Sequence, residues 1–217
     1  TSGFLISSYK YILRENNTSK NGSFLTAEDR KKLLENLNGY DISPDMVRIS
    51  LVNMYLHGLS NPKISEYDSL SNPLHWNEYF DVILANPPFM TPKGGIIPHD
   101  LFSIKSKKSE ILFVDYILSH LKPEGRCAIV VPEGINFVGQ KAYKQIRKNL
   151  IDKGLICDIT LPHGVFKPYA SVKTHILIVN NQFSSKVNDV LFIEIDNDGF
   201  TQTDTRLPIK GEQLTSA

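Results

Sequence analysis

The stretch Phe80-Asp81-Val82-Ile83-Leu84-Ala85-Asn86-Pro87-Pro88-Phe89 governs how the rest of the chain is interpreted. Residues 80–85 form a short apolar, β-branched run with the length and composition of a buried strand. The strand is expected to end at the two prolines, because neither can donate a hydrogen bond to a ladder. An amide, two carbonyls of fixed direction and an aromatic ring should therefore lie at the carboxyl end of a strand. Open α/β sheets bind ligands at that edge.

The four residues after this strand suit one chemical task. The exocyclic amine of adenine is a poor nucleophile because its lone pair is delocalised into the ring. The side-chain oxygen of Asn86 and the carbonyl of Pro87 can accept hydrogen bonds from the two N–H groups of that amine. These bonds would draw the nitrogen towards tetrahedral geometry. The ring of Phe89 can stack on a base extruded from a duplex. An ordinary turn after a strand is the alternative interpretation.

Three segments together resemble a known family. Asn86-Pro87-Pro88-Phe89 after an apolar strand is similar to the catalytic motif of amino-group DNA methyltransferases of the adenine-N6 type. Thr1-Ser2-Gly3-Phe4-Leu5-Ile6 resembles the tail of the glycine motif in modification subunits of type I restriction systems. The region Leu161–Thr174 resembles the same subunits. The resemblance extends from Thr1 to about Arg206, and it implies that the first strand and most of the glycine loop are missing here.

Composition and length limit the classes of protein. The 217 residues can bury the core of one domain, and a net charge of +1 neither supports nor excludes nucleic-acid binding. No apolar run approaches the roughly 20 residues of a membrane span, and no signal-peptide pattern is present. A cytoplasmic location is therefore expected. Cys127 and Cys157 lie in strand-like runs and should be buried, reduced thiols. Cysteine and histidine show no zinc-type spacing, and no metal is expected.

Alternating patterns predict an α/β fold with its elements in a definite order. Helices are expected at 4–14, 27–37, 44–57, 109–121 and 140–152, and strands at 38–42, 63–70, 80–85, 126–131, 154–161, 172–180 and 190–196. The link between the strands at 154–161 and 172–180 is too short for a helix, so these two should pair as an antiparallel hairpin. Such a hairpin separates methyltransferase sheets from purely parallel dinucleotide-binding sheets.

The resemblance turns this pattern into a specific fold class. It implies a Rossmann-like S-adenosylmethionine-dependent methyltransferase sheet with a C-terminal antiparallel hairpin and with the first strand missing. The family's strand order is 3-2-1-4-5-7-6, so the missing strand should expose the inner edges of its two neighbours. A strand shift, another chain, or poor stability of the isolated fragment are open alternatives. We expect residues 1–181 to form a partial catalytic domain and residues 182–217 to add a strand and a polar tail to it.

The cofactor site is predicted partly from position and partly from resemblance. Asp41 ends the second expected strand, where an acid can bond ribose hydroxyls, although an Asx turn is an equal alternative. The resemblance implies S-adenosyl-L-methionine as cofactor, with Asp41 at its ribose, Asp68 at its adenine and Ile42 as a further cofactor-binding residue. Further cofactor-binding residues implied are Thr1, Gly3 and Asn86. By position alone, Asp68 is a turn residue.

Two further regions have open alternatives. The segment Met90–Lys108 has no regular pattern and is basic, so it is either a mobile loop that closes over substrate or a solvated surface loop. The helix expected at 140–152 carries a basic run on its outer face, for which solvation is the default and contact with DNA the alternative. Phe166 or Tyr169 helps to form the wall of a base pocket, or both belong to the core.

The resemblance implies a reaction and partners. The parent protein would transfer a methyl group from S-adenosylmethionine to N6 of a flipped adenine in double-stranded DNA, with Asn86, Pro87, Pro88 and Phe89 as catalytic residues. A specificity subunit would choose the sequence, and a restriction subunit is a further partner. The isolated chain is expected to be inactive. The alternatives are methylation of RNA or of a protein glutamine, and a non-catalytic assembly module. Cofactor binding separates enzyme from module.

Overall fold

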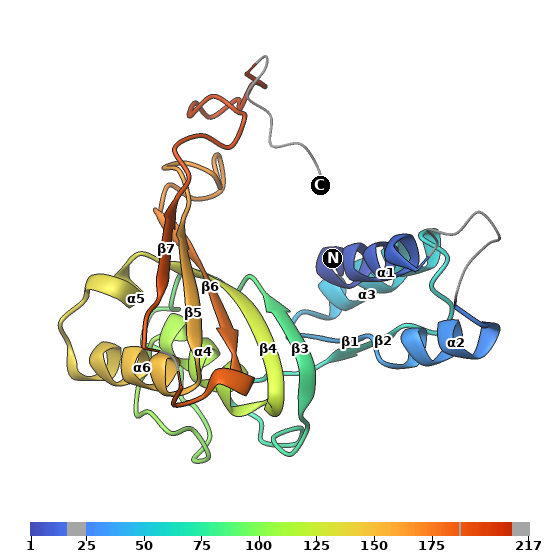
Figure 1. Cartoon of the computed structure of the whole chain (residues 1–217), viewed down its shortest axis with the longest axis horizontal. Helices are drawn as coiled ribbons and strands as arrows, with labels where there is room; N and C mark the ends of the chain where they lie inside the picture. Colours follow the sequence, from blue (N-terminus) through green and yellow to red (C-terminus); the bar gives the residue numbers. More distant parts are fainter. Residues whose placement is uncertain (17–24, 187, 210–217) are drawn as a thin grey trace. The chain divides into compact units, whose positions relative to one another are not determined.

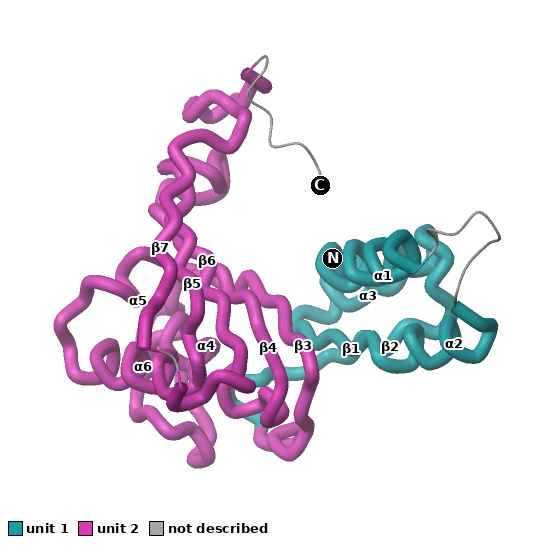
Figure 2. The backbone as a smooth tube through the Cα atoms, in the orientation of Figure 1, with its two compact units in different colours: residues 1–72 teal, residues 73–217 magenta. Residues whose placement is uncertain are grey.

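The chain divides into two compact units, each with its own core. The computed structural model describes residues 1–16, 25–186 and 188–209. The units are Thr1–Asn72 and Pro73–Ala217 (Figure 2). Ile6, Leu37, Met54 and Leu59 cluster in the first unit. The expected division of the catalytic domain at residue 181 stays a prediction.

The first unit contains three helices and a two-stranded parallel sheet. Its elements are α1 (Gly3–Glu15), α2 (Ala27–Glu35), β1 (Asn38–Asp41), α3 (Pro44–Leu56) and β2 (Lys63–Glu66). The strands pair from Asn38↔Lys63 to Asp41↔Glu66. Local signals explain the helix limits, because Ser43 caps α3 with Pro44 in its first turn. Gly58 then ends α3 at a φ of +79°, a conformation that favours glycine.

The second unit is built on a mixed sheet of five strands, which lie side by side in the order β3-β4-β6-β5-β7 (Figure 1). These strands are β3 (Phe80–Ala85), β4 (Leu121–Pro132), β5 (Leu155–Thr160), β6 (Thr174–Asn180) and β7 (Leu191–Glu194). β3 and β4 are parallel, whereas β6 runs antiparallel to both β4 and β5. The predicted hairpin is therefore confirmed. β7 adds a parallel strand beside β5.

Helices α4 (Ser109–Ser119) and α6 (Lys141–Asp152) cover one face of this sheet, and a short helix α5 (Gly134–Phe137) precedes α6. The expected apolar face of α4 is confirmed, since Ile111, Val114 and Leu118 are all buried. They pack with Ile129, Leu177 and the apolar side of α6 in one core. A 3₁₀ turn, η1 (Asn181–Phe183), follows β6.

Within each unit, the strand neighbours agree with the order that the resemblance implies. The pieces β2-β1 and β3-β4-β6-β5 correspond to strands 3-2 and 4-5-7-6 of that order. Among the described residues, β1 pairs only with β2 and β3 only with β4. In the part of the chain that the structure describes, β1 and β3 therefore each have one edge without a paired strand.

Three sequence-based expectations need correction. β3 is not buried on both faces, because Ile83 and Ala85 pack against the core of α4 and α6 while Val82 and Leu84, on the other face, are 50% and 39% exposed. β4 begins at Leu121 rather than Arg126, with an irregularity in its pairing to β3. Gly125 belongs to that irregularity, since a Cβ there would lie 2.9 Å from the carbonyl oxygen of Phe80. The third correction is α5, which was not expected.

Both cysteines are free and buried, as predicted. Burial raises the pKa of Cys127 to about 12 and also raises that of Cys157. Neither thiol is thus ready to form a reactive thiolate. Among the described residues, no helix is long and apolar enough to span a membrane.

Candidate functional site

The predicted catalytic tetrapeptide lies where the sequence placed it, at the carboxyl end of β3. Ala85 is the last residue of the strand and pairs with Ile129, and Asn86 follows directly. Asn86 and Pro88 are exposed, whereas Pro87 and Phe89 are half-buried. The Asn86 amide is therefore accessible beside a ring that the protein partly covers.

A second aromatic ring lies against Phe89. The ring centroids of Phe89 and Phe166 are 5.2 Å apart and the planes are inclined by 68°, an edge-to-face contact. Phe166 belongs to the link between β5 and β6, so two segments far apart in the sequence meet at this point. Tyr169, the other aromatic considered for a pocket wall, is 95% exposed. The contact distinguishes Phe166 from Tyr169, which sequence reasoning did not.

The segment that carries the tetrapeptide has few fixed contacts. No backbone–backbone hydrogen bond outside helices and strands involves residues 86–91, as far as the described residues show. The side chain of Thr91 makes hydrogen bonds to Ser109 and Glu110 at the start of α4. Besides the restricted φ of Pro87 and Pro88, side-chain contacts therefore hold this segment in place.

The middle of the segment Met90–Lys108 is held against α4. The buried carboxylate of Asp115 accepts hydrogen bonds from the amides of Ser103 (2.9 Å) and Ile104 (3.1 Å) and from the Ser103 hydroxyl (2.6 Å). The rings of His99 and Phe102 lie 4.6 and 5.1 Å from that of Trp76. These contacts favour the surface-loop interpretation over a lid for this part of the segment.

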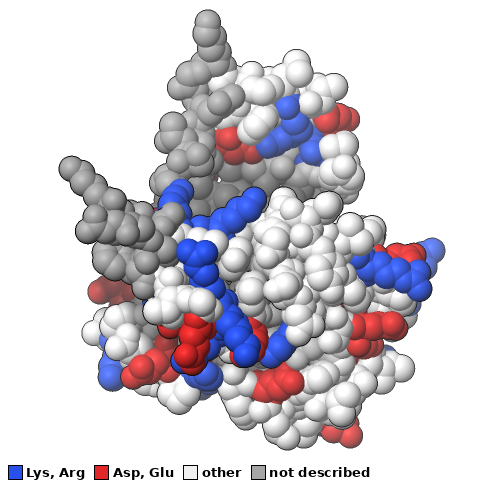
Figure 3. All heavy atoms as spheres, turned by 90° about the vertical axis from the view of Figure 1, so that its right-hand side faces the viewer, with Lys and Arg blue, Asp and Glu red and all other residues white. Residues whose placement is uncertain are grey.

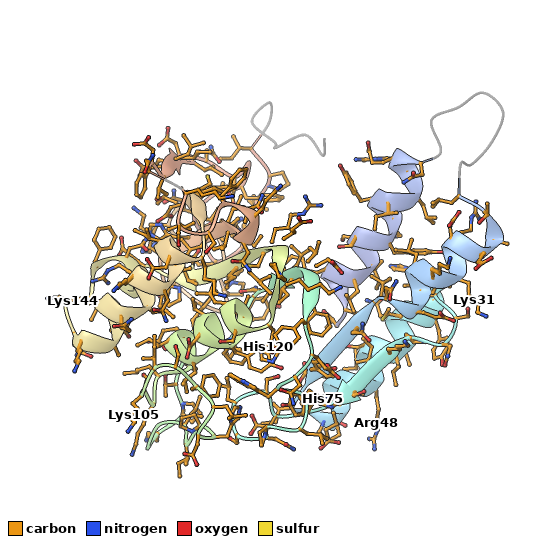
Figure 4. The ribbon with its side chains drawn as sticks, turned by 60° about the horizontal axis from the view of Figure 1, so that its bottom comes forward. Lys31, Arg48, His75, Lys105, His120 and Lys144 are labelled. Atoms are coloured by element: carbon orange, nitrogen blue, oxygen red, sulfur yellow. The ribbon has the colours of Figure 1, made fainter. Side chains whose placement is uncertain are left out.

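The basic side chains expected at the surface of the second unit do not all point outward. Lys105 points outward from its loop and Lys144 outward from α6 (Figure 4). Arg147, expected on the outer face of α6, instead donates to the backbone carbonyls of Ile135 (2.8 Å) and Val138 (3.0 Å). The face shown in Figure 3 is the right-hand side of Figure 1, so the basic and acidic side chains seen there do not describe α6. The default interpretation of a solvated helix face is retained.

The two acidic cofactor candidates lie at the same edge of the first unit's sheet. Asp41 ends β1, and Asp68 lies two residues beyond the end of the parallel strand β2. Oδ1 of Asp41 accepts a hydrogen bond from the Ser43 amide (2.9 Å), which is the Asx turn considered from sequence. Oδ1 of Asp68 accepts from the amides of Leu70 (3.0 Å) and Ser71 (3.2 Å).

These turns still leave acceptors for a ligand. No donor from the described residues reaches Oδ2 of either Asp41 or Asp68, and both side chains are only half-buried. Ile42 is 64% exposed and presents an apolar side chain next to Asp41. Two carboxylate oxygens and an apolar side chain at one sheet edge fit the ribose hydroxyls, the amine and the flat face of an adenosine group.

The glycine-motif candidates lie at the start of α1. The carbonyl of Thr1 accepts a hydrogen bond from Asn53 Nδ2 at 2.8 Å, which ties this end to α3. Ser2 has a φ of +57° and Gly3 opens the helix. A Cβ at Gly3 would meet no atom within 4 Å, so the described chain supplies no steric reason for glycine there.

The candidates therefore fall into two coherent groups, one in each unit. Thr1, Gly3, Asp41, Ile42 and Asp68 belong to the first unit, and the tetrapeptide with Phe166 belongs to the second. Among the described residues, no group of three or more His, Cys, Asp or Glu side chains could hold a metal ion.

Comparison with known proteins gives the family. A family model described as N-6 DNA methylase matches residues 1–216. The methylase subunit of the type I restriction enzyme EcoEI from Escherichia coli is 32% identical over 219 residues, which cover 99% of this chain and 43% of that protein. The methylase subunit of EcoKI from Escherichia coli K12 is 29% identical over 193 residues, covering 82% of this chain and 34% of that one.

Solved structures give the same result. A structure described as the basis of complex assembly and conformational transition of a type I restriction–modification system matches with a TM-score of 0.74 and 28% identity, covering 94% of this chain and 42% of that one. The crystal structure of the EcoKI M protein matches with a TM-score of 0.72 and 26% identity, covering 82% and 37%.

A mixed α/β sheet that contains an antiparallel hairpin, with Asn-Pro-Pro-Phe at the carboxyl end of a strand, defines a methyltransferase-type protein. The chain belongs to the N-6 DNA methylase family and is homologous to type I methylase subunits over nearly its whole length. It spans 43% of the EcoEI methylase subunit and 34% of the EcoKI one.

Proposed function

We propose that this chain forms the catalytic part of a DNA adenine-N6 methyltransferase, the methylase subunit of a type I restriction–modification system. The observation that carries the proposal is the position of Asn86-Pro87-Pro88-Phe89 at the end of β3, with a second aromatic ring, Phe166, against Phe89. Membership of the family supports it. The activity is assigned to a protein that contains this chain.

The Asn86 side-chain oxygen and the Pro87 carbonyl would act on the target amine. Two acceptors at a fixed separation can accept hydrogen bonds from both N–H groups of the amine. This arrangement directs the nitrogen lone pair out of the base plane. The reaction is an in-line displacement, so the main contribution of these groups is orientation of the nucleophile. Pro87 and Pro88 hold the backbone with restricted φ, which limits the positions that these acceptors can adopt.

Phe89 and Phe166 would hold the base. A base that leaves the duplex loses stacking energy, and aromatic side chains recover part of it, about 1–3 kcal/mol per stacked base. Phe89 is half-buried, so one part of its ring is packed and another remains available. The edge-to-face contact with Phe166 would fix the tilt of the Phe89 ring.

S-adenosylmethionine, when bound, supplies the methyl group. Asp41 would accept hydrogen bonds from the ribose hydroxyls through its available Oδ2, and Asp68 would accept a hydrogen bond from the adenine amine. Ile42 would pack against the adenosine group, and Thr1 and Gly3 are further cofactor candidates in the first unit; Asn86, in the second unit, stays a cofactor candidate by resemblance. Double-stranded DNA, a specificity subunit and a restriction subunit are the proposed partners of the whole protein.

Two alternatives use the same fold. Methylation of RNA or of a protein glutamine would need the same pair of acceptors, but those relatives more often have tyrosine at the position of Phe89. A non-catalytic assembly module would retain the fold without needing Asn86. Substitution of Asn86 therefore separates a methyltransferase, which needs the residue, from an assembly module, which does not.

The first test is methyl transfer from radiolabelled S-adenosylmethionine to unmethylated duplex DNA by the protein that contains this chain, with its specificity subunit. Asn86→Ala removes one acceptor for the amine and is expected to lower the rate by about 10²- to 10³-fold. Asn188→Ala is the matched control, because Asn188 is exposed and lies outside every helix and strand. Equal rates for the unsubstituted and Asn86→Ala proteins would refute the proposal.

A further inference from the structure

Thr91 is the residue that ties the tetrapeptide segment to the rest of the second unit. It lies two residues beyond Phe89, and its side chain makes every hydrogen bond that the described structure records for residues 86–91 outside helices and strands. The Ser109 amide, the first of α4, donates to Thr91 Oγ1 at 3.0 Å. The N-cap residue Lys108 makes no side-chain capping bond, so Thr91 satisfies a helix-end amide from outside the helix.

The carboxylate of Glu110 accepts the hydrogen bond that the Thr91 hydroxyl donates. Its Oε2 lies 3.3 Å from Thr91 Oγ1 and 3.4 Å from Ser109 Oγ, both hydroxyl donors. Glu110 is in the first turn of α4, where the helix dipole favours a negative charge. Thr91 Oγ1 accepts a hydrogen bond from the Ser109 amide on a lone pair. Its hydroxyl hydrogen can therefore point to the Glu110 carboxylate.

Tyr143 on α6 fixes the carboxylate in turn. Its hydroxyl donates to Glu110 Oε1 at 2.5 Å, a short, charge-assisted hydrogen bond. Tyr143 is buried, and burial together with the nearby Glu110 carboxylate raises the pKa of its hydroxyl. Tyr143 therefore stays a donor at every ordinary pH. The chain of contacts runs from α6 through α4 to Thr91.

We propose that Glu110 and Tyr143 are positioning residues, which hold Thr91 and through it the segment that carries Asn86 and Phe89. The inference extends the proposed function, and it concerns side chains that touch neither the base nor the cofactor. Since residues 86–91 lack other anchoring hydrogen bonds, loss of this network should free the Phe89 ring from its contact with Phe166. The core beneath it would stay in place, because Tyr143→Phe keeps the buried ring.

Local order is measured on the 217-residue chain itself by ¹⁹F NMR after incorporation of 4-fluorophenylalanine. Phe89→Leu, Phe166→Leu and Phe102→Leu assign the resonances of these three residues. In Thr91→Val and Glu110→Gln, which leave the number of phenylalanines unchanged, the Phe89 resonance is expected to shift towards its unfolded-chain position and to narrow, with the resonance of Phe102 unmoved. Glu124→Gln is the matched control, because Glu124 is an exposed glutamate without a recorded ion pair and should leave Phe89 unchanged.

Catalysis supplies the second measurement, in the methylating protein that contains the chain. Tyr143→Phe is expected to lower kcat by about ten- to a hundredfold, because small misplacements of reacting groups have effects of that size. The Kd for S-adenosylmethionine should stay within about twofold, since the cofactor candidates other than Asn86 lie elsewhere. A merely structural role would lower the melting temperature and the active fraction without changing kcat per active site.

The outcomes separate the two claims. An unmoved Phe89 resonance in both variants overturns the positioning role, whether or not the protein methylates DNA. A shift of all phenylalanine resonances together also overturns it, because the network would then stabilise the whole unit. A shift confined to Phe89 in a protein that does not methylate DNA would support the anchoring and refute the proposed function.

Discussion

The two units of this chain use similar strands but build very different cores. Among the described residues, both contain a parallel strand pair with at least one unpaired edge. In the second unit, the hairpin of β5 and β6 extends the sheet, and α4 and α6 bury Ile129, Leu177 and their neighbours completely. The first unit buries a small cluster around Met54 and leaves several apolar side chains of α3 exposed. A parallel pair alone does not create a core, because it needs further strands and a covered face.

The largest effect should come from the core of the second unit. Leu177 is fully buried on β6, and Leu177→Ala should lower the free energy of unfolding of this unit by about 2–5 kcal/mol, because it leaves a cavity. Trp76, the one tryptophan of the chain, lies in this unit, so its fluorescence during urea unfolding reports the change. Leu207→Ala is the control, since Leu207 is 61% exposed and should change little.

Met54→Ala makes the same kind of deletion in the smaller core. Met54 is fully buried, so the first unit should lose helical circular dichroism at lower urea concentration, while the midpoint seen by Trp76 stays in place. An equal shift of the Trp76 midpoint would mean that both units unfold as one, and the comparison of two cores would then be wrong.

Much of this fold could be predicted from local patterns. The limits of β3 were predicted correctly, and the helices expected to begin at residues 27 and 44 do begin there. These features depend on neighbours in the sequence, such as a cap, a proline or a run of β-branched residues. The partial exposure of β3 could not be predicted, because it depends on which face the distant helices α4 and α6 cover.

The candidate site divides in the same way. The position of Asn86 after a strand follows from the two prolines, whereas the contact of Phe89 with Phe166 depends on how two distant segments meet. Thr91, Glu110 and Tyr143 gave no sequence signal, since a hydroxyl or a carboxylate acquires a role only from its partners in space. The roles proposed for Asp41 and Asp68 stay predictions.

Acid should weaken the second unit through His120. Its ring is buried, stacked on Tyr116 and 4.9 Å from Trp76. Burial lowers the pKa of His120, although hydrogen bonds to the backbone of Tyr116 and His75 oppose the shift. His120 therefore binds a proton more readily in the unfolded chain than in the folded unit. Stability is full above the ordinary histidine pKa of about 6.5 and falls as the pH drops below it.

Urea midpoints from Trp76 fluorescence, measured from roughly pH 7.5 to pH 5, test this expectation. His120→Phe keeps a ring against Tyr116 and should flatten the decline below about pH 6.5. His57→Gln in the first unit is the matched control, because His57 is exposed at the end of α3. A curve for His120→Phe that still follows the unsubstituted protein would assign the decline to other groups.

The smallest effect is expected at the start of α2 in the first unit. Thr26 and Asp29 form a capping box, in which Thr26 Oγ1 accepts from the Asp29 amide (3.1 Å) and the Thr26 amide donates to Asp29 Oδ2 (3.0 Å). Thr26→Ala should destabilise α2 by about 1 kcal/mol, whereas Thr26→Ser should retain the cap. Circular dichroism at the helix band measures the loss. Because the first unit has the smaller core, this modest change should appear as a lower midpoint there and leave the Trp76 midpoint unchanged. A shift at Trp76 would instead show that the two cores share their stability.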